Sequence, residues 1–159
     1  MNQPLVDTMN IPYYSFCSRP LIKNLIKMKD SLADNDSGAV ISKITEYAAE
    51  LEKGKAHIIV EIIEYLPNAV VSRTIIKKIT GNITVSSFDA GEELAEKLSP
   101  FDAFIQIIDG SAELSINDKI QTLKLGDGII IPAHAKHHFN ANVQFKMIST
   151  VIKSAYEDF

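Results

Sequence analysis

"GDGIIIPAHAKHHFNAN", residues 126–142, is the stretch that decides the fold of this 159-residue chain. Its apolar run ends at Pro132, and proline is tolerated at a strand end because its missing N–H is not needed there. Three of the four histidines in the chain follow within five residues, namely His134, His137 and His138. The flanking sequence is strand-like, so the three imidazoles do not share one face as they would on a helix. The stretch therefore belongs to a β structure, and its histidines are candidate metal ligands.

Short β-branched segments fill the chain after Gly54, and Gly, Asn, Asp or Pro separates most of them. These segments are HIIVEIIEYL, NAVVSRTIIKKI, NITVSSF, AFIQIID, SAELSIN, KIQTLKL, GIIIP and FKMISTVIK. Such a pattern is typical of an all-β sandwich or barrel. "GN" at 81–82 and "ND" at 117–118 predict tight turns. Gly110 and Gly126 are expected at strand ends, in turns that need a positive φ.

Two further expectations concern the middle of the chain. Within AFIQIID, strict alternation puts Ala103, Ile105 and Ile107 on one face of a strand. Gln106 would then line a pocket only if the alternation were reversed. "EEL" at 92–94 is expected to be a solvated loop.

The part of the chain before these segments is predicted to be an arm, residues 1–55, with two helices. Residues 20–32 carry apolar side chains at helical spacing behind a proline suited to a first helical turn. Residues 39–54 repeat the helical spacing, and Gly54 suits the end of a helix. The remaining residues, 56–159, form the predicted β domain.

Size and charge exclude several classes of protein. A mass of 17.6 kDa, 46% hydrophobic residues and a formal net charge of −4 are ordinary for one globular domain with an appendage. No strongly basic stretch is present, so we expect no nucleic-acid partner. No apolar window predicts a membrane span, and the first residues do not resemble a signal peptide. The single cysteine, Cys17, fits a reducing compartment, so we expect a cytoplasmic protein.

Two glycine-punctuated stretches give the chain a resemblance to the cupin superfamily. The first is GEELAEKLSPFDAFIQIIDG, from Gly91 to Gly110, and the second is the stretch that begins at Gly126. Cupins carry a first motif G-x5-H-x-H-x3-4-E-x6-G and, after a spacer that is often short, a second motif G-x5-P-x-G-x2-H-x3-N. The frame glycines and Pro132 match these motifs in register. The chain is also similar to small bacterial single-cupin proteins of mostly unassigned function.

The resemblance implies a fold and an assembly. The fold is an all-β, cupin-type double-stranded β-helix, or jelly-roll barrel, with an N-terminal helical extension. The assembly is a homodimer, and the apolar strands and the amphipathic arm offer surface for it to bury.

Three of the four positions at which cupins hold a metal carry unsuitable residues here. The resemblance puts Lys97 and Ser99 at the first-motif histidines, Ala103 at the glutamate and His137 at the second-motif histidine. Alanine has no donor atom, neutral serine is a poor ligand, and a protonated lysine repels a cation. We therefore expect no cofactor. The alternative is a divalent transition metal at His137, helped by His134, which stands where the motif has a glycine.

Lys97 is the unusual member of this set, because a buried ammonium group is costly unless it is paired. One interpretation is that its positive charge replaces the metal and binds a carboxylate or another anionic small molecule. A second gives it a lowered pKa and a role as base or Schiff-base nucleophile. A third lets the side chain extend to solvent without a role.

The sequence thus favours a small-molecule-binding barrel that has lost its metal, with Lys97, Ser99 and His137 as polar contacts in a mostly apolar pocket. No catalytic residue can be assigned, and a binding protein fits the residues better than an enzyme. Two alternatives stay open. One is a metal-dependent cupin enzyme of the dioxygenase or isomerase type with a degenerate site. The other is a protein-interaction module that uses the helical arm.

Overall fold

The computed structural model describes residues 49–153, and this part of the chain is all-β, as expected. Its strands are β1 (Val70–Lys78), β2 (Gly81–Phe88), β3 (Glu93–Leu98), β4 (Ala103–Ile116), β5 (Lys119–Lys124), β6 (Gly128–Ile131), β7 (Lys136–Asn140) and β8 (Phe145–Ile152). One turn of 3-10 helix, η2 (Ile59–Glu61), precedes them. No helix among the described residues is long and apolar enough to span a membrane.

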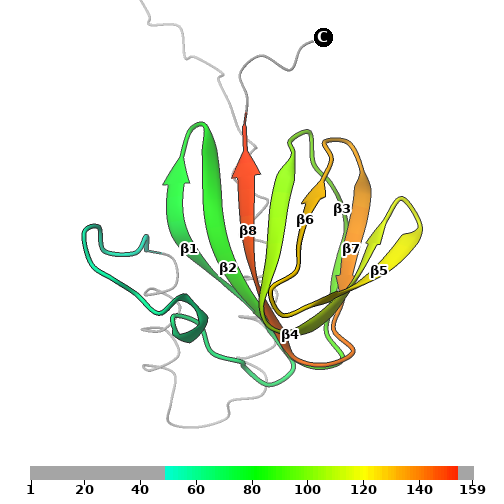
Figure 1. The fold of residues 1–159 in the computed structure, drawn as a ribbon, viewed down its shortest axis with the longest axis horizontal. Coiled ribbons are helices and arrows are strands. Elements are labelled where there is room, and N and C mark those ends of the chain that lie inside the picture. The colour runs from blue at the N-terminus through cyan, green and yellow to red at the C-terminus, as the bar shows by residue number, and fades with distance from the viewer. Residues whose placement is uncertain (1–48, 154–159) are drawn as a thin grey trace, which may run out of the picture.

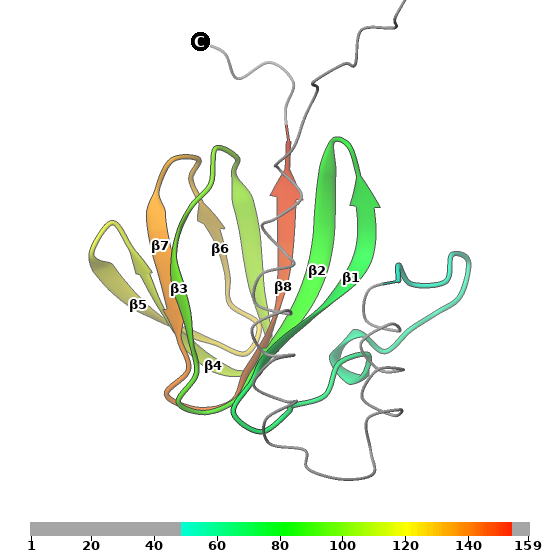
Figure 2. The same ribbon diagram turned by 180° about the vertical axis from the view of Figure 1, so that it is seen from behind.

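Strand β4 belongs to two curled sheets at once (Figures 1 and 2). Its first half pairs with β8 and β6, and its second half pairs with β7 and β5. The first sheet continues from β8 to β2 and β1, and the second continues from β7 to β3. All of these pairings are antiparallel, and together they form the double-stranded β-helix expected from the sequence. The predicted segments AFIQIID and SAELSIN are therefore one continuous strand and not two.

The interior of the barrel follows the alternation of β4. Ala103, Ile105 and Ile107 share one face of the strand, as predicted, and all three are buried, whereas Phe104 between them is 42% exposed. The end of the barrel near the bend of β4 is filled by three aromatic rings that contact one another, those of Phe88, Phe139 and Phe145. These rings close one end of the interior with apolar surface.

Two turns test the sequence predictions directly. Asn117 and Asp118 form the two-residue turn between β4 and β5, with φ of 46° and 65°. Positive φ at both positions is the mark of a type I′ turn, so this prediction is confirmed. The turn expected at 81–82 lies two residues earlier, because Lys78 pairs with Gly81 and the turn is made by residues 79–80.

The glycines that frame the motif adopt the expected backbone. Gly110 has a φ of 69° and Gly126 a φ of 90°. At Gly110 a Cβ atom would also clash with the carbonyl oxygen of Gln144, which lies in the loop between β7 and β8. Glycine at 110 is thus required both by its own dihedral angle and by a close approach of backbone.

Residues 57–66, which we call the outer segment, are not the strand that HIIVEIIEYL predicts. They cross the outer face of the first sheet beside β1 and β2 (Figure 1). Side chains from that sheet donate hydrogen bonds to three carbonyl groups of the outer segment. These carbonyl groups therefore have partners without a neighbouring strand. These hydrogen bonds join Lys146 Nζ to Val60 O at 2.7 Å, Arg73 to Ile62 O at 2.9 Å and Ser87 Oγ to Glu64 O at 2.8 Å.

The outer segment also gives the first sheet a second apolar core. Ile63 is buried against Val71 and Val85, and partly buried isoleucines surround them. Tyr65 covers Lys146, whose Nζ lies 4.8 Å from the ring centroid, and the Tyr65 hydroxyl donates to Asp109 at 2.9 Å. The first sheet is therefore covered on its outer face as well as its inner one.

Residues 49–54 differ from the helix predicted over 39–54, because they are not helical. The N–H of Leu51 donates to the carbonyl of Ile75 at 3.2 Å, and a Glu50 carboxylate oxygen accepts from the N–H of Lys77 at 2.8 Å. Both contacts satisfy β1, an edge strand whose outer groups lack a neighbouring strand. The rest of the predicted arm lies outside the described residues. The boundary at residues 55 and 56 and the homodimer stay predictions.

Candidate functional site

A cavity of about 130 Å³ lies inside the barrel, between the two sheets. Its wall includes all four positions that the sequence resemblance singled out: Lys97, Ser99, Ala103 and His137. They come from β3, the loop after it, the start of β4, and β7. The frame glycines and Pro132 thus bring together residues that are up to forty positions apart in the chain (97 to 137).

Lys97 and His137 form the centre of this wall. The two residues are direct cross-strand partners in the pairing of β3 with β7, and such partners on one face of a sheet have Cβ atoms about 4.5–5.5 Å apart. Lys97 is half-buried and His137 is 9% exposed. A lysine and a histidine therefore stand side by side at the cavity.

The protonation of His137 follows from its contacts. Its Nδ1 lies 3.1 Å from the carbonyl oxygen of Ala135. A carbonyl only accepts hydrogen bonds, so Nδ1 carries a proton and Nε2 of the neutral ring is an acceptor. Burial lowers the pKa of His137, the Ala135 carbonyl opposes that shift, and electrostatic interactions with Lys97 and His138 lower the pKa further. The ring is thus held neutral, with a lone pair on Nε2.

Ser99 lines the cavity, but its hydroxyl is used within its own loop. Its Oγ donates to the carbonyl of Phe101 and accepts from the N–H of the same residue, both at 3.1 Å. Its carbonyl accepts from the N–H of His134 at 2.6 Å. Ser99 therefore shapes the loop between β3 and β4, and its predicted contact with a ligand stays a prediction.

The structure does not bring His134 or His138 to the cavity that His137 lines. His134 is exposed in the turn between β6 and β7, with a φ of 61°. This left-handed conformation explains why the motif has a glycine at that position. His138 follows His137 in a strand, so its side chain points to the opposite face, as the sequence predicts.

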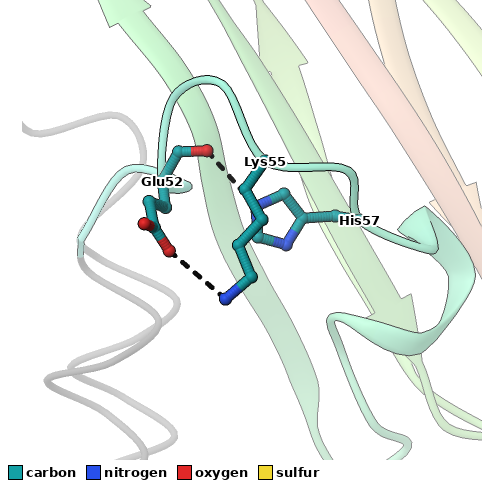
Figure 3. A network of polar contacts seen from close by, with 3 residues as sticks. All are labelled: Glu52, Lys55 and His57. Atoms are coloured by element: carbon teal, nitrogen blue, oxygen red, sulfur yellow. Dashed lines mark hydrogen bonds and ion pairs between the residues drawn. The ribbon is translucent and has the colours of Figure 1, made fainter.

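The fourth histidine, His57, is not among the residues that line the cavity, and its contacts are with Glu52 and its neighbours (Figure 3). Its Nε2 lies 3.3 Å from the backbone oxygen of Glu52, and Lys55 Nζ lies 3.3 Å from a carboxylate oxygen of the same residue. The two charged side chains are 63% and 69% exposed. Ion pairs as exposed as this contribute about 0–1 kcal/mol, so this group is a surface turn and not a candidate site.

The opposite wall of the cavity is polar, and the sequence analysis missed it. On β2, the side chains of Asn82, Thr84 and Ser86 line the cavity, while Val85 and Ser87 face the outer segment. Neighbouring strands extend this polar surface. We call its four hydroxyl-bearing residues the hydroxyl belt: Ser72 of β1, Thr84 and Ser86 of β2, and Ser149 of β8.

The signal for this wall was present in NITVSSF, where polar residues alternate along the strand. Alternation alone does not say which face of a strand points inward. In most barrels the apolar face of a strand points inward, and for NITVSSF that would be the face with Val85. The outer segment reverses that arrangement, because it gives Val85 an apolar environment outside the barrel.

The members of the hydroxyl belt differ in their hydrogen bonds. Ser72 Oγ and Ser86 Oγ lie 2.7 Å apart, so one of the two donates to the other. Thr84 and Ser149 are cross-strand partners, and neither hydroxyl has a hydrogen-bond partner within residues 49–153. Their O–H groups are thus available to a molecule in the cavity.

The donors on the cavity wall do not fit a transition metal. Within residues 49–153, the wall carries a single imidazole, from His137, beside the ammonium of Lys97, and no carboxylate or thiolate. Transition metals bind to sets of imidazole, carboxylate and sulfur ligands, whereas neutral hydroxyls are weak ligands. Among residues 49–153, no group of three or more His, Cys, Asp and Glu side chains is placed to hold a metal ion.

The chain was compared with known protein families, curated proteins and solved structures. No protein-family model and no curated protein matches the chain. Solved structures do match. A conserved protein of unknown function from Streptococcus pyogenes is 30% identical with a TM-score of 0.63, and the match covers 68% of this chain and 95% of that one. A cupin superfamily protein from Desulfitobacterium hafniense is 24% identical with a TM-score of 0.63, covering 67% and 98%. An RmlC-like cupin from Desulfovibrio desulfuricans is 20% identical with a TM-score of 0.56, covering 62% and 95%.

Proposed function

This chain has the cupin fold, and from that premise we propose that its barrel binds a small organic anion at Lys97. The observation that supports the proposal is the charge of the cavity wall. Among the described residues that line the cavity, Lys97 is the one with a formal charge at neutral pH, and none of these residues is acidic. A lysine thus stands where the resemblance places the first metal-binding histidine of the family.

The surroundings of Lys97 suit an anion more than a cation. Opposite it in the sheet, His137 is neutral and supplies a lone pair rather than a second charge. The hydroxyls of the far wall add donors without adding negative charge. Because a half-buried site screens charge less than water does, attraction between the ammonium and a carboxylate is stronger there than on the surface.

Binding of a ligand is the role that these residues support best. The Lys97 ammonium orients the acid group, and Nε2 of His137 accepts a hydrogen bond from a ligand O–H or N–H. The aromatic rings of Phe88 and Phe139 provide apolar surface at the closed end of the cavity. A pocket that is mostly apolar, with a few convergent polar groups, is the usual form of a small-molecule site.

The proposal is tested by calorimetry and thermal unfolding of the full chain, purified without an affinity tag. The probes are sodium propionate and sodium glycerate, with glycerol as a neutral comparison. We expect saturable binding of at least one acid and a rise in melting temperature with its concentration. Lys97→Met should weaken that binding by at least tenfold, because the charge is lost and the length of the side chain is kept.

The matched control is Lys119→Met, which removes an exposed lysine from β5. It should bind the acid as the unaltered protein does. If neither acid binds, or if Lys97→Met binds as tightly as the control, the anion site is wrong. Near-stoichiometric transition metal in the tag-free protein, lost in His137→Ala, would instead support the metal-dependent alternative.

A further inference from the structure

We propose that the anion is a hydroxy acid of about three or four carbons, and that the hydroxyl belt binds its hydroxyl groups. This inference rests on the proposed anion site and adds a second set of contacts on the opposite wall. Lys97 and His137 belong to the second sheet, whereas the belt belongs to the first. The ligand would therefore bridge the two sheets of the barrel.

The cost of the belt is the first reason for this inference. Thr84 is 8% exposed and Ser86 is 6% exposed, although both face the interior of the barrel. Ser86 shares a hydrogen bond with Ser72, whereas the Thr84 hydroxyl faces the cavity without a partner among residues 49–153. A fully buried hydroxyl without a partner would cost about 1–3 kcal/mol, so a polar wall stabilises the barrel less than an apolar wall would. Apolar side chains do occur on β2, because Val85 is buried in the apolar cluster on the other face of this strand. Polar residues on the inner face thus point to a ligand that hydrogen-bonds to them.

The donors and acceptors available in the cavity identify the chemical group. In the pair of Ser72 and Ser86, one hydroxyl donates to the other, and the accepting hydroxyl keeps its own proton for a ligand. Thr84 and Ser149 offer further O–H donors and lone pairs. Nε2 of His137 can only accept. A ligand hydroxyl both donates and accepts, so it matches this mixed surface, whereas a carboxylate only accepts and matches Lys97.

The size of the cavity limits the carbon chain. An apolar cavity of about 150 Å³ holds benzene, a molecule of about six non-hydrogen atoms, so the cavity here, about 130 Å³, suits a molecule of about that size. Glycerate is close to this size. A larger sugar or a nucleotide would extend out of the cavity through its open side.

The decisive experiment compares three small molecules that differ in one group each. Glycerate carries the acid and two hydroxyls, propionate carries the acid alone, and glycerol carries hydroxyls alone. Calorimetry on the full chain should show glycerate binding at least tenfold more tightly than propionate, with glycerol weaker than either. Thr84→Val removes one belt hydroxyl and keeps the shape of the side chain. It should weaken glycerate binding about tenfold and leave propionate binding unchanged.

A matched control is Thr122→Val, the same substitution at an exposed position on β5, which should change neither affinity. Ser149→Ala is a second belt variant, on β8, and keeps the test decisive if Thr84→Val does not fold. Equal binding of propionate and glycerate, unaffected by both belt variants, would refute the belt and leave the anion site standing. Failure of both acids to bind would refute the anion site and this inference together. Glycerol binding as tight as that of glycerate would refute the role of the acid group.

Discussion

Replacing Thr84 by valine should stabilise the protein without ligand, even though it weakens binding. The side chain is 8% exposed, and its hydroxyl has no hydrogen-bond partner among the described residues. Valine has nearly the same shape and puts a methyl group in place of the hydroxyl. A fully buried hydroxyl without a partner costs about 1–3 kcal/mol, but the Thr84 hydroxyl faces the cavity, where water offsets part of that cost. We therefore expect the free energy of unfolding to rise by about 1 kcal/mol.

Urea unfolding followed by circular dichroism measures this change. For a domain of this size, about 1 kcal/mol corresponds to a rise of roughly 4 °C in melting temperature. Thr122→Val on the surface should stay within about 0.5 kcal/mol of the unaltered protein. In saturating glycerate the order should reverse, because the unaltered protein gains more from the ligand than Thr84→Val does.

Two results would contradict this reasoning. A loss of 1 kcal/mol or more in Thr84→Val without ligand would mean that the hydroxyl stabilises the folded protein by itself, through a protein partner (a loss of about this size is typical of a broken hydrogen bond). Equal stabilisation of both proteins by glycerate would mean that the ligand does not contact Thr84.

Four further substitutions test the backbone and two histidines. His134→Gly should raise the free energy of unfolding by about 0.5–1 kcal/mol in urea, because relief of a left-handed φ of 61° outweighs the entropy of glycine; a loss would contradict this. Gly110→Ala should cost at least about 2 kcal/mol, and more than Gly126→Ala, since only the first adds a backbone clash to a positive φ. His137 has a lowered pKa, so the unfolded chain takes up its proton first and stability should fall as pH drops below about 6.5 through the folded-state pKa. His137→Asn should remove that part of the pH dependence of the melting temperature.

The wall that carries Lys97 and His137 could be predicted from the sequence because the chain resembles the cupin motifs. Gly110, Gly126 and Pro132 match those motifs in register, and each restricts its own backbone. The resemblance then assigned Lys97 and His137 to two of the metal-binding positions, and the structure pairs these residues across β3 and β7.

The opposite wall of the cavity, formed by β1, β2 and β8, could not be predicted in the same way. Which face of β2 points inward depends on what covers the other face, and that cover is the outer segment. The outer segment itself looks like a strand in sequence, because its partners are side chains far along the chain. Lys146, for example, is 86 residues from the carbonyl of Val60 that it binds. Local periodicity carries no information about such a contact.

The "EEL" expectation failed for a related reason. Glu93 and Leu94 begin strand β3, and Leu94 lines the cavity beside Phe139, its cross-strand partner. Two adjacent glutamates suggest a solvated loop when they are considered alone. In the structure, Glu93 is exposed, and the strand is defined by its pairing with β7 rather than by its composition.

The position of β8 has a consequence for how the protein is made. This strand is synthesised last among the eight, yet it lies inside the first sheet, between β2 and β4. The hairpins β1–β2 and β4–β5 can pair as soon as they leave the ribosome, because their contacts are local. Their inner edges, however, stay open until Phe145–Ile152 emerges, and open edges of this kind favour aggregation. A chain whose synthesis stops before Phe145 therefore lacks β8, a central strand of the first sheet, rather than an edge strand.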